Sequence, residues 1–162
     1  MTMTTNDAPG RTGLATWGEM AAAAPRLAER GRALFMPTGT GDGLLATVRG
    51  DAPPRIHPVS FEIVDGELLV FVLRSAKLTD LQQDGRYALH ANIDEAAPSE
   101  FMVRGVAREV TDPIVRAAAA GVWSFTVDDT YRLFALDIAS AALGERPTAN
   151  AWPPVYTRWM AP

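Results

Sequence analysis

The stretch RIHPVSFEIVDGELLVFVLRSAKLTDLQQDGRYALHAN, which runs from Arg55 to Asn92, decides the fold of this chain. Two segments rich in Val, Ile, Leu and Phe meet at Asp65-Gly66, and an Asp-Gly pair between two apolar runs predicts a tight β-hairpin. The second segment leads into a short helical pattern at residues 75–83, and another strand pattern follows at 86–93. The stretch therefore predicts strand, turn, strand, helix and strand in that order.

Residues 74–77 gather the chemistry that binds an anion. Arg74, Ser75 and Lys77 place two cations and a hydroxyl at a helix start, where free backbone N–H groups also attract phosphate. An isolated motif this short is more often a solvated surface turn capped by its serine. Its position at the end of a strand and before a helix favours a phosphate-ester site over that alternative.

The whole chain has the pattern of a mainly β protein with short helices. Helical patterns begin at Thr16, which has capping-box spacing to Glu19, at Pro25, at Ser75 and at Asp112-Pro113. Short strands that follow one another with few helices predict a six- to seven-stranded antiparallel barrel, because closure removes exposed edges. Residues 1–13 predict a disordered leader, and 14–162 a single domain. The predicted strands are 44–49, 55–64, 67–73, 86–93, 101–110 and 131–138.

Composition excludes several classes of protein. The 162 residues carry a net charge of −4, which argues against a nucleic-acid surface. The absence of cysteine excludes disulfides and cysteine nucleophiles and fits a reducing cytoplasm. The two histidines lack acidic or histidine neighbours at ligand spacing, so we predict no metal site. The longest apolar run, residues 68–73, is too short for a membrane span.

The order of these motifs resembles the pyridoxamine 5'-phosphate oxidase-like family of flavin-binding split barrels. The resemblance rests on R-x-H-P-V-S, the Asp-Gly hairpin, R-S-x-K with its helix, and a later V-x-G-x-A, and it covers residues 44–113. It implies an FMN-binding split barrel, an oxidoreductase that transfers hydride to or from a small organic substrate, and a homodimer with FMN at the interface. By this resemblance, cofactor contact falls on Arg55, His57, Val59, Ser60, Arg74, Ser75 and Lys77.

Departures from the family pattern keep other functions open. The oxidase usually has a basic residue where this chain has Ser60 and a glutamine near the position of Phe101, and its C-terminal substrate-phosphate motif has no clear match in 151–162. These gaps argue against pyridoxamine phosphate oxidation itself. An F420-dependent reductase of the same fold, a non-catalytic flavin- or haem-binding protein and a carrier of apolar ligands remain alternatives. We favour FMN over F420, because the cations near the motif are only Arg74, Lys77 and Arg86.

Several single residues carry further expectations. No catalytic residue is predicted, since the flavin ring supplies the hydride chemistry. His90 is expected to be structural and to point away from the apolar side of its strand, formed by Tyr87, Leu89, Ala91 and Ile93. A small barrel fills its interior with side chains, so we expect the cofactor to lie between two copies. The resemblance places an aromatic or an arginine of 152–159 at this site, and the interface is expected around Val59, Phe61 and Phe101.

Overall fold

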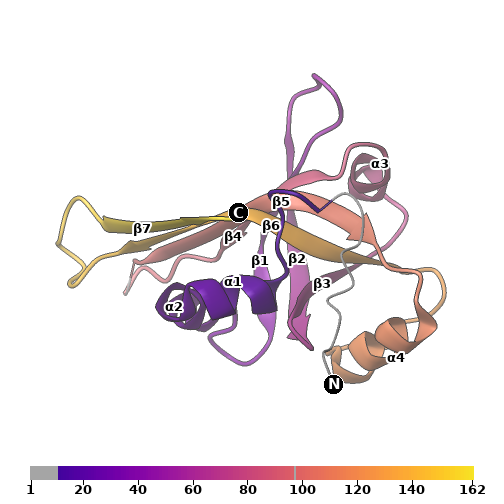
Figure 1. The fold of residues 1–162 in the computed structure, drawn as a ribbon, viewed down its shortest axis with the longest axis horizontal. Helices are drawn as coiled ribbons and strands as arrows, with labels where there is room; N and C mark the ends of the chain where they lie inside the picture. Colours follow the sequence, from indigo (N-terminus) through magenta and orange to yellow (C-terminus); the bar gives the residue numbers. More distant parts are fainter. Residues whose placement is uncertain (1–10, 97) are drawn as a thin grey trace.

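The computed structural model describes residues 11–96 and 98–162, which form seven strands and four short helices (Figure 1). Residues 1–10 of the expected leader lie outside the described part, while Gly13 donates a backbone hydrogen bond to Pro162. The helices are α1 (Trp17–Ala23), α2 (Pro25–Phe35), α3 (Ala76–Gln83) and α4 (Pro113–Val122). The strands are β1 (Gly41–Thr47), β2 (Arg55–Val64), β3 (Glu67–Val72), β4 (Arg86–Ala91), β5 (Glu100–Glu109), β6 (Arg132–Glu145) and β7 (Val155–Met160).

The strands form one antiparallel sheet that closes on itself. Their order is β3-β2-β1-β4-β5-β6-β7, and β3 also pairs with β6. Six strands therefore make a closed barrel, and β7 extends the sheet from β6 as a long hairpin that projects from the barrel (Figure 1). This arrangement confirms the predicted antiparallel split barrel of six to seven strands.

The Asp65-Gly66 turn forms as the sequence predicts. Asp65 has a φ of 49° and Gly66 a φ of 79°, so both central residues of the hairpin lie in the left-handed region. Two positive φ angles define the type I′ turn, whose twist matches that of the flanking strands. The turn fixes the register of β2 against β3, in which Val64 is opposite Glu67.

The predicted helix starts are also found. Thr16 Oγ1 accepts from the backbone N–H of Glu19 at 3.1 Å, and the Glu19 carboxylate accepts from the N–H of Thr16 at 2.7 Å, which completes a capping box. Asp112 caps α4 by accepting from the N–H of Ile114 at 2.8 Å. Pro25 and Pro113 occupy first-turn positions of α2 and α4.

Aromatic side chains fill the interior of the barrel. Phe35 of α2 lies 4.8 Å, centroid to centroid, from the rings of both Phe61 and Phe101, and all three are fully buried. A Cβ at Gly31 would lie 2.4 Å from Phe101, so only glycine lets α2 pack this closely. The side chains of Phe61 and Phe101 therefore cannot contribute to the expected dimer interface, because both point into the core of the barrel.

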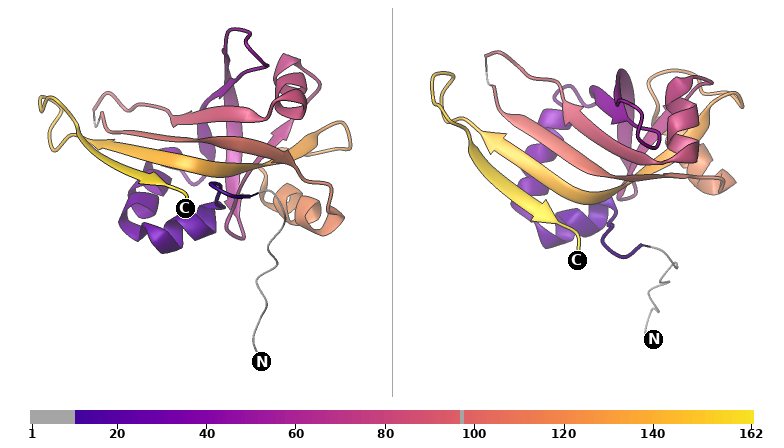
Figure 2. Two further views of the ribbon diagram at one scale, coloured as in Figure 1. Left: turned by 45° about the horizontal axis from the view of Figure 1, so that its top comes forward. Right: turned by 90° about the horizontal axis from the view of Figure 1, so that it is seen from above.

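The outer side of the barrel is covered unevenly. Helix α4 packs on the outer face of β3 and β6, where Phe71 and Trp123 meet at 4.8 Å. The outer face of β4, β5, β6 and β7 has no described helix over it, and Figure 2 shows these strands side by side with α1 and α2 behind them. This open face is where residues of four strands can line one surface.

Several strand ends differ from the sequence prediction; β1, for example, spans Gly41–Thr47 instead of 44–49. β6 continues to Glu145 instead of ending near residue 138, because pairing with β5 and β7 holds a segment of mostly small residues that has little intrinsic strand preference. β4 ends at Ala91, and Ile93 is 56% exposed. The expectation that Ile93 extends the apolar side of this strand is therefore wrong.

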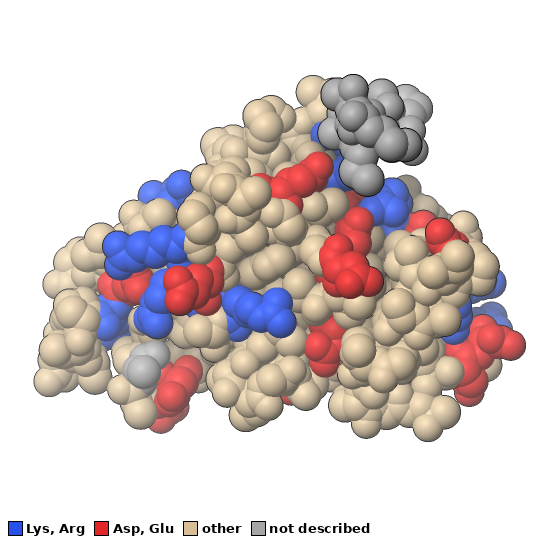
Figure 3. Space-filling view, turned by 60° about the horizontal axis from the view of Figure 1, so that its bottom comes forward, with Lys and Arg blue, Asp and Glu red and all other residues tan. Residues whose placement is uncertain are grey.

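Charges are mixed on the surface. Acidic and basic side chains alternate on the face shown in Figure 3, and several form ion pairs, such as Arg30 with Glu145 at 2.9 Å. That face lacks the clustered basic surface that a nucleic acid requires. None of the described helices has the length and apolar character to span a membrane.

Candidate functional site

Helix α3 starts where the sequence predicts, with Ser75 as its cap. Ser75 is the N-cap: its hydroxyl accepts from the N–H of Leu78 at 3.2 Å and donates to the Leu73 carbonyl at 3.0 Å. A helix start leaves backbone N–H groups without intrahelical partners, and these groups attract anions. Arg74 is exposed directly before the cap.

Lys77 lies in the first turn of α3 and lines a pocket of about 240 Å3, here called the Lys77 pocket. Its ammonium group forms no ion pair with any carboxylate of the described residues. Burial lowers the pKa of Lys77 below its usual value, since the charged form loses solvation. The other walls of the pocket include Val59, Ser60, Phe71, Phe125 and Tyr131.

The Arg55 side chain forms an ion pair with a buried carboxylate. Its guanidinium donates to both oxygens of Asp80 at 2.9 and 2.8 Å, and Thr47 Oγ1 donates to Asp80 at 2.9 Å. The Asp80 side chain has no solvent exposure. Burial tends to raise the pKa of Asp80, but the hydrogen bonds from Arg55 and Thr47 outweigh it and lower the pKa below 3.8. This network ties α3 to β1 and β2.

His57 faces the same side of β2 as Arg55, two residues further along the strand. Its Nε2 atom is buried and has no hydrogen-bond partner among the described residues. Burial lowers the pKa of His57, and the charge of Lys77 lowers it further. An unpartnered buried nitrogen on the strand that supplies Val59 and Ser60 to the Lys77 pocket is a candidate ligand contact.

The structure brings together some of the predicted site residues and separates others. Val59, Ser60 and Lys77 line one pocket, and Ser75 caps the helix from which Lys77 projects. The Ser60 hydroxyl donates to Asp42 at 2.8 Å. Arg55 contacts Asp80 instead of facing this pocket. No group of three metal-ligating side chains occurs within residues 11–96 and 98–162.

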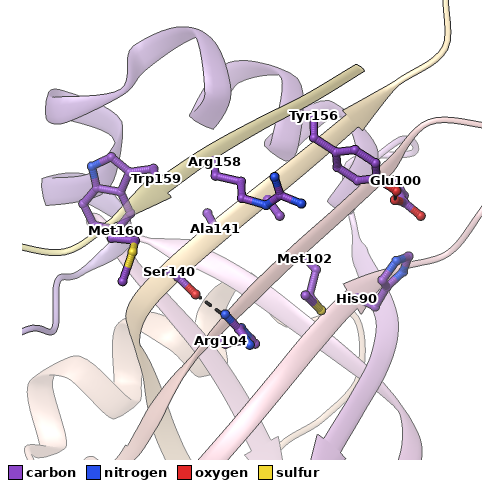
Figure 4. A pocket seen from close by; sticks show the side chains of 11 residues that line it. His90, Glu100, Met102, Arg104, Ser140, Ala141, Tyr156, Arg158, Trp159 and Met160 are labelled. Atoms are coloured by element: carbon purple, nitrogen blue, oxygen red, sulfur yellow. Dashed lines mark hydrogen bonds between the residues drawn. The ribbon is translucent and has the colours of Figure 1, made fainter. Parts of the chain in front are cut away.

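A second hollow lies on the open outer face of β4 to β7, and we call it the arginine groove (Figure 4). Its volume is about 520 Å3. Arg104 of β5 donates to Ser140 Oγ at 3.3 Å, and the Arg158 guanidinium lies 5.1 Å from the centre of the Tyr156 ring. The Tyr156 hydroxyl donates to the Glu100 carboxylate, which raises the pKa of Tyr156.

His90 also lines this groove. As expected, it points away from the buried side chains of Tyr87, Leu89 and Ala91. Its Nδ1 lies 2.6 Å from the Ala91 carbonyl, which can only accept, so Nδ1 is the donor in this contact and Nε2 takes no part in it. The ring is thus partly satisfied by the backbone and partly available to the groove.

Sequence patterns missed Glu100 and Arg104, and the resemblance placed an aromatic or an arginine of 152–159 at the cofactor site, whereas Tyr156 and Arg158 line the groove. The available signal was the alternation along two strand patterns, in which residues 100, 102 and 104 share one face and 156, 158 and 160 share another. That signal does not show that β5 and β7 flank the same strand. The strand order supplies that information, since β6 pairs with both.

Comparisons with known proteins bear on the fold. No family model and no curated protein matches the sequence. Among solved structures, a heme binding protein from Mycobacterium smegmatis is 17% identical with a TM-score of 0.59, over 78% of this chain and 56% of that one. An FAD-binding protein from Mesorhizobium loti is 17% identical with a TM-score of 0.56, over 70% and 90%. A candidate pyridoxamine 5'-phosphate oxidase from Listeria innocua is 14% identical with a TM-score of 0.55, over 71% and 95%.

These similarities, together with the strand order, establish the fold. The chain has the split-barrel fold of pyridoxamine 5'-phosphate oxidase-like proteins, as the order of its motifs predicted. It spans 56% of the length of the heme binding protein. Relatives of this fold include proteins described as heme binding and FAD-binding.

Proposed function

We propose that the protein is an FMN-dependent oxidoreductase that transfers hydride to or from a small organic substrate. The cofactor phosphate is assigned to the start of α3, with Ser75 and Lys77, and the ring to the edge of β2 at Val59 and Ser60. One observation carries this proposal: the only lysine of the chain is half-buried beside a helix start, with no carboxylate partner among the described residues.

The residues present fit a phosphate-bearing cofactor. Taking an ammonium group out of water without a partner is unfavourable, and a bound phosphate would offset that cost at Lys77. Arg74 adds a second cation at the rim, and the helix start adds N–H donors. The aromatic walls at Phe71, Phe125 and Tyr131 offer an apolar surface for the rest of the ligand.

Each predicted cofactor residue has a role in this proposal. Lys77 and Arg74 bind the phosphate, and Ser75 fixes the helix start that faces it. His57 offers its buried Nε2 atom to the ligand. Arg55 acts through Asp80 and positions α3 instead of touching the cofactor. FMN, when bound, supplies the hydride chemistry, and the protein supplies position and electrostatics.

We also propose that the site is completed by a second copy of the chain. A volume of about 240 Å3 is below the roughly 300–1,000 Å3 usual for small-molecule sites. The barrel interior offers no room, because buried side chains fill it. The outer face of β1 and β2 next to the pocket exposes Leu44 and Ile56, which are 43% and 68% exposed. A symmetric homodimer through this face would cover both residues.

A binding function without turnover is the second candidate. Structures of this fold are described as heme binding and FAD-binding, and the described residues that line the Lys77 pocket include no carboxylate and no histidine. An F420-dependent reductase is the third, since F420 also carries a phosphate. Both alternatives share the phosphate anchor and differ in what the rest of the site accepts.

Titration of FMN into the purified protein and two variants tests the anchor. Lys77→Ala is expected to weaken FMN binding by about 1.5–3 kcal/mol, or about ten- to a hundredfold, which is the usual worth of a hydrogen bond to a charged group. Arg32→Ala removes an exposed cation from α2 and should leave the affinity unchanged. Unchanged affinity of Lys77→Ala for both FMN and F420 would show that the phosphate assignment is wrong.

Two further measurements separate the candidates. Absorbance of the FMN-loaded protein should bleach with a reductant and recover with an acceptor if it is an oxidoreductase. Loss of recovery across a panel of acceptors would favour the binding function. Sedimentation should show a dimer at micromolar concentration, and a monomer that still binds FMN tightly would contradict the shared site.

A further inference from the structure

We propose that the arginine groove binds a small planar organic anion, at a site separate from the Lys77 pocket. The carboxylate or phosphate group of this ligand lies over β6, between Arg104 of β5 and Arg158 of β7. This proposal does not require a bound flavin, so it can be tested independently of the oxidoreductase proposal.

The strand register places the two arginines on opposite sides of one strand. Arg104 is opposite Ser140 on β6, and Arg158 is opposite Ala142, two residues further along the same strand. Neighbouring strands lie about 4.8 Å apart, so β5 and β7 are roughly 10 Å from each other. Two arginine side chains can close that distance above small residues, and Figure 4 shows both in the same hollow.

The charges of the groove favour an anion. Neither Arg104 nor Arg158 forms an ion pair with a carboxylate in the part of the chain that the structure describes. Glu100, the one acid lining the groove, accepts a hydrogen bond from Tyr156. Two guanidinium groups without acidic partners in a chain of net charge −4 mark a locally positive site.

The walls between the arginines suit an apolar, planar body. Met102 and Met160 border the groove, and Ala142 of β6 lines it with only a methyl side chain. Methionine packs well against aromatic rings and adapts to their shape. The volume of about 520 Å3 lies within the usual range for small-molecule sites. An aromatic carboxylate or aryl phosphate therefore matches both the charge and the surface.

The groove is distinct from the Lys77 pocket in the same protomer. Pro58 lines that pocket and His90 lines the groove, and the register runs from Pro58 through Leu44 to His90. These are two strand spacings, or about 10 Å, and the proposed anion position over β6 lies two strands further along the sheet. A small ligand in the groove cannot contact Lys77 at the same time, so variants can separate the two sites.

Phenyl phosphate is a suitable probe, with benzyl alcohol as its uncharged counterpart. NMR titration of the full chain should shift the side-chain N–H signals of Arg104 and Arg158 with phenyl phosphate and not with benzyl alcohol. Arg104→Gln and Arg158→Gln should each weaken phenyl phosphate binding by about tenfold or more. Arg26→Gln, at an arginine of α2 whose side chain is 85% exposed, and Lys77→Ala should leave the response of the Arg104 and Arg158 signals to phenyl phosphate unchanged.

Several outcomes would overturn the proposal. Equal binding of benzyl alcohol would make the groove a merely apolar surface. Binding that is lost in Lys77→Ala and kept in both arginine variants would place the anion in the Lys77 pocket. Phenyl phosphate that dissociates a dimer, measured by sedimentation, would show that the groove is an interface between copies. Thermal unfolding of each variant checks that both glutamine substitutions leave the fold intact.

Discussion

The Lys77 pocket and the arginine groove are both cationic, yet the protein holds their charges in different ways. Lys77 is half-buried on a helix that the fully buried Asp80 ties to β1 and β2. Arg104 and Arg158 are exposed on strands whose positions the sheet already fixes. A ligand bound in the pocket would therefore be coupled to a buried network, whereas a ligand bound in the groove would contact side chains that folding does not need.

Asp80→Asn is expected to have the largest effect, because it removes the charge that holds Arg55 and α3. We expect a loss of about 2–3 kcal/mol of stability, which is less than for a fully buried pair since the Arg55 side chain is 39% exposed. Denaturant unfolding measures this loss. Asp51→Asn, at an exposed aspartate in the loop before β2, is the matched control and should be near neutral.

The same variant has a defined pH signature. Because the folded protein lowers the pKa of Asp80, its contribution is complete above 3.8 and is lost as pH falls through the lower folded value. The difference between wild type and Asp80→Asn should therefore shrink at acid pH. Arg158→Gln should leave stability unchanged throughout. A difference that persists at the acid end of the titration would mean that Asp80 does not act through its charge.

Local signals in the sequence were enough to predict the barrel. The Asp65-Gly66 turn, the Thr16 capping box and the prolines of α2 and α4 all act within a few residues, so their geometry follows from the sequence alone. The end of β6 could not be predicted from the sequence, because pairing with the two neighbouring strands overrides the weak strand preference of residues 139–144. The inward direction of Phe61 and Phe101 depends on the barrel closing around them.

The candidate site was predictable only in part. The R-S-x-K motif placed Ser75 and Lys77 at a helix start, since the capping serine and the helical pattern are adjacent in sequence. The partner of Arg55 could not be predicted, because Asp80 lies 25 residues away on another element. The arginine groove joins β5 with β7, which are far apart in sequence and meet only through β6.

The choice between FMN and F420 also tests the difference between the pocket and the groove, and its expected effect is smaller than that of Asp80→Asn. F420 carries a carboxylate-rich tail, and the arginines of the groove lie on β5 and β7, about 14 Å or more along the sheet from the pocket. We expect FMN to bind at least as tightly as F420, and Arg104→Gln to leave both affinities unchanged. Titrations at low and moderate salt measure this. An F420 dissociation constant about tenfold lower than that of FMN, and rising with salt, would reverse the choice.

Lys77→Met is expected to have the smallest effect, and its sign is opposite to that of Asp80→Asn. Burial lowers the pKa of Lys77, so the folded protein disfavours the charged form at every pH below that lowered value. Methionine keeps a similar length and removes the charge. Without a ligand, the variant should be about 0.5–1 kcal/mol more stable than wild type at neutral pH. This expected gain is small because the Lys77 side chain is half-exposed and water still screens its charge.

The pH dependence and a neighbouring cation make this last prediction specific. Wild-type stability should rise with pH between the lowered pKa of Lys77 and 10.5, since the unfolded chain binds more protons there, and the advantage of Lys77→Met should fade across that interval. Arg74→Met, which removes an exposed cation three residues away, should bring no such gain. Added FMN should reverse the order by stabilising wild type more than Lys77→Met. A variant that is less stable than wild type without ligand would show that the Lys77 side chain stabilises the fold by packing. The idea that its buried charge destabilises the ligand-free protein would then be wrong.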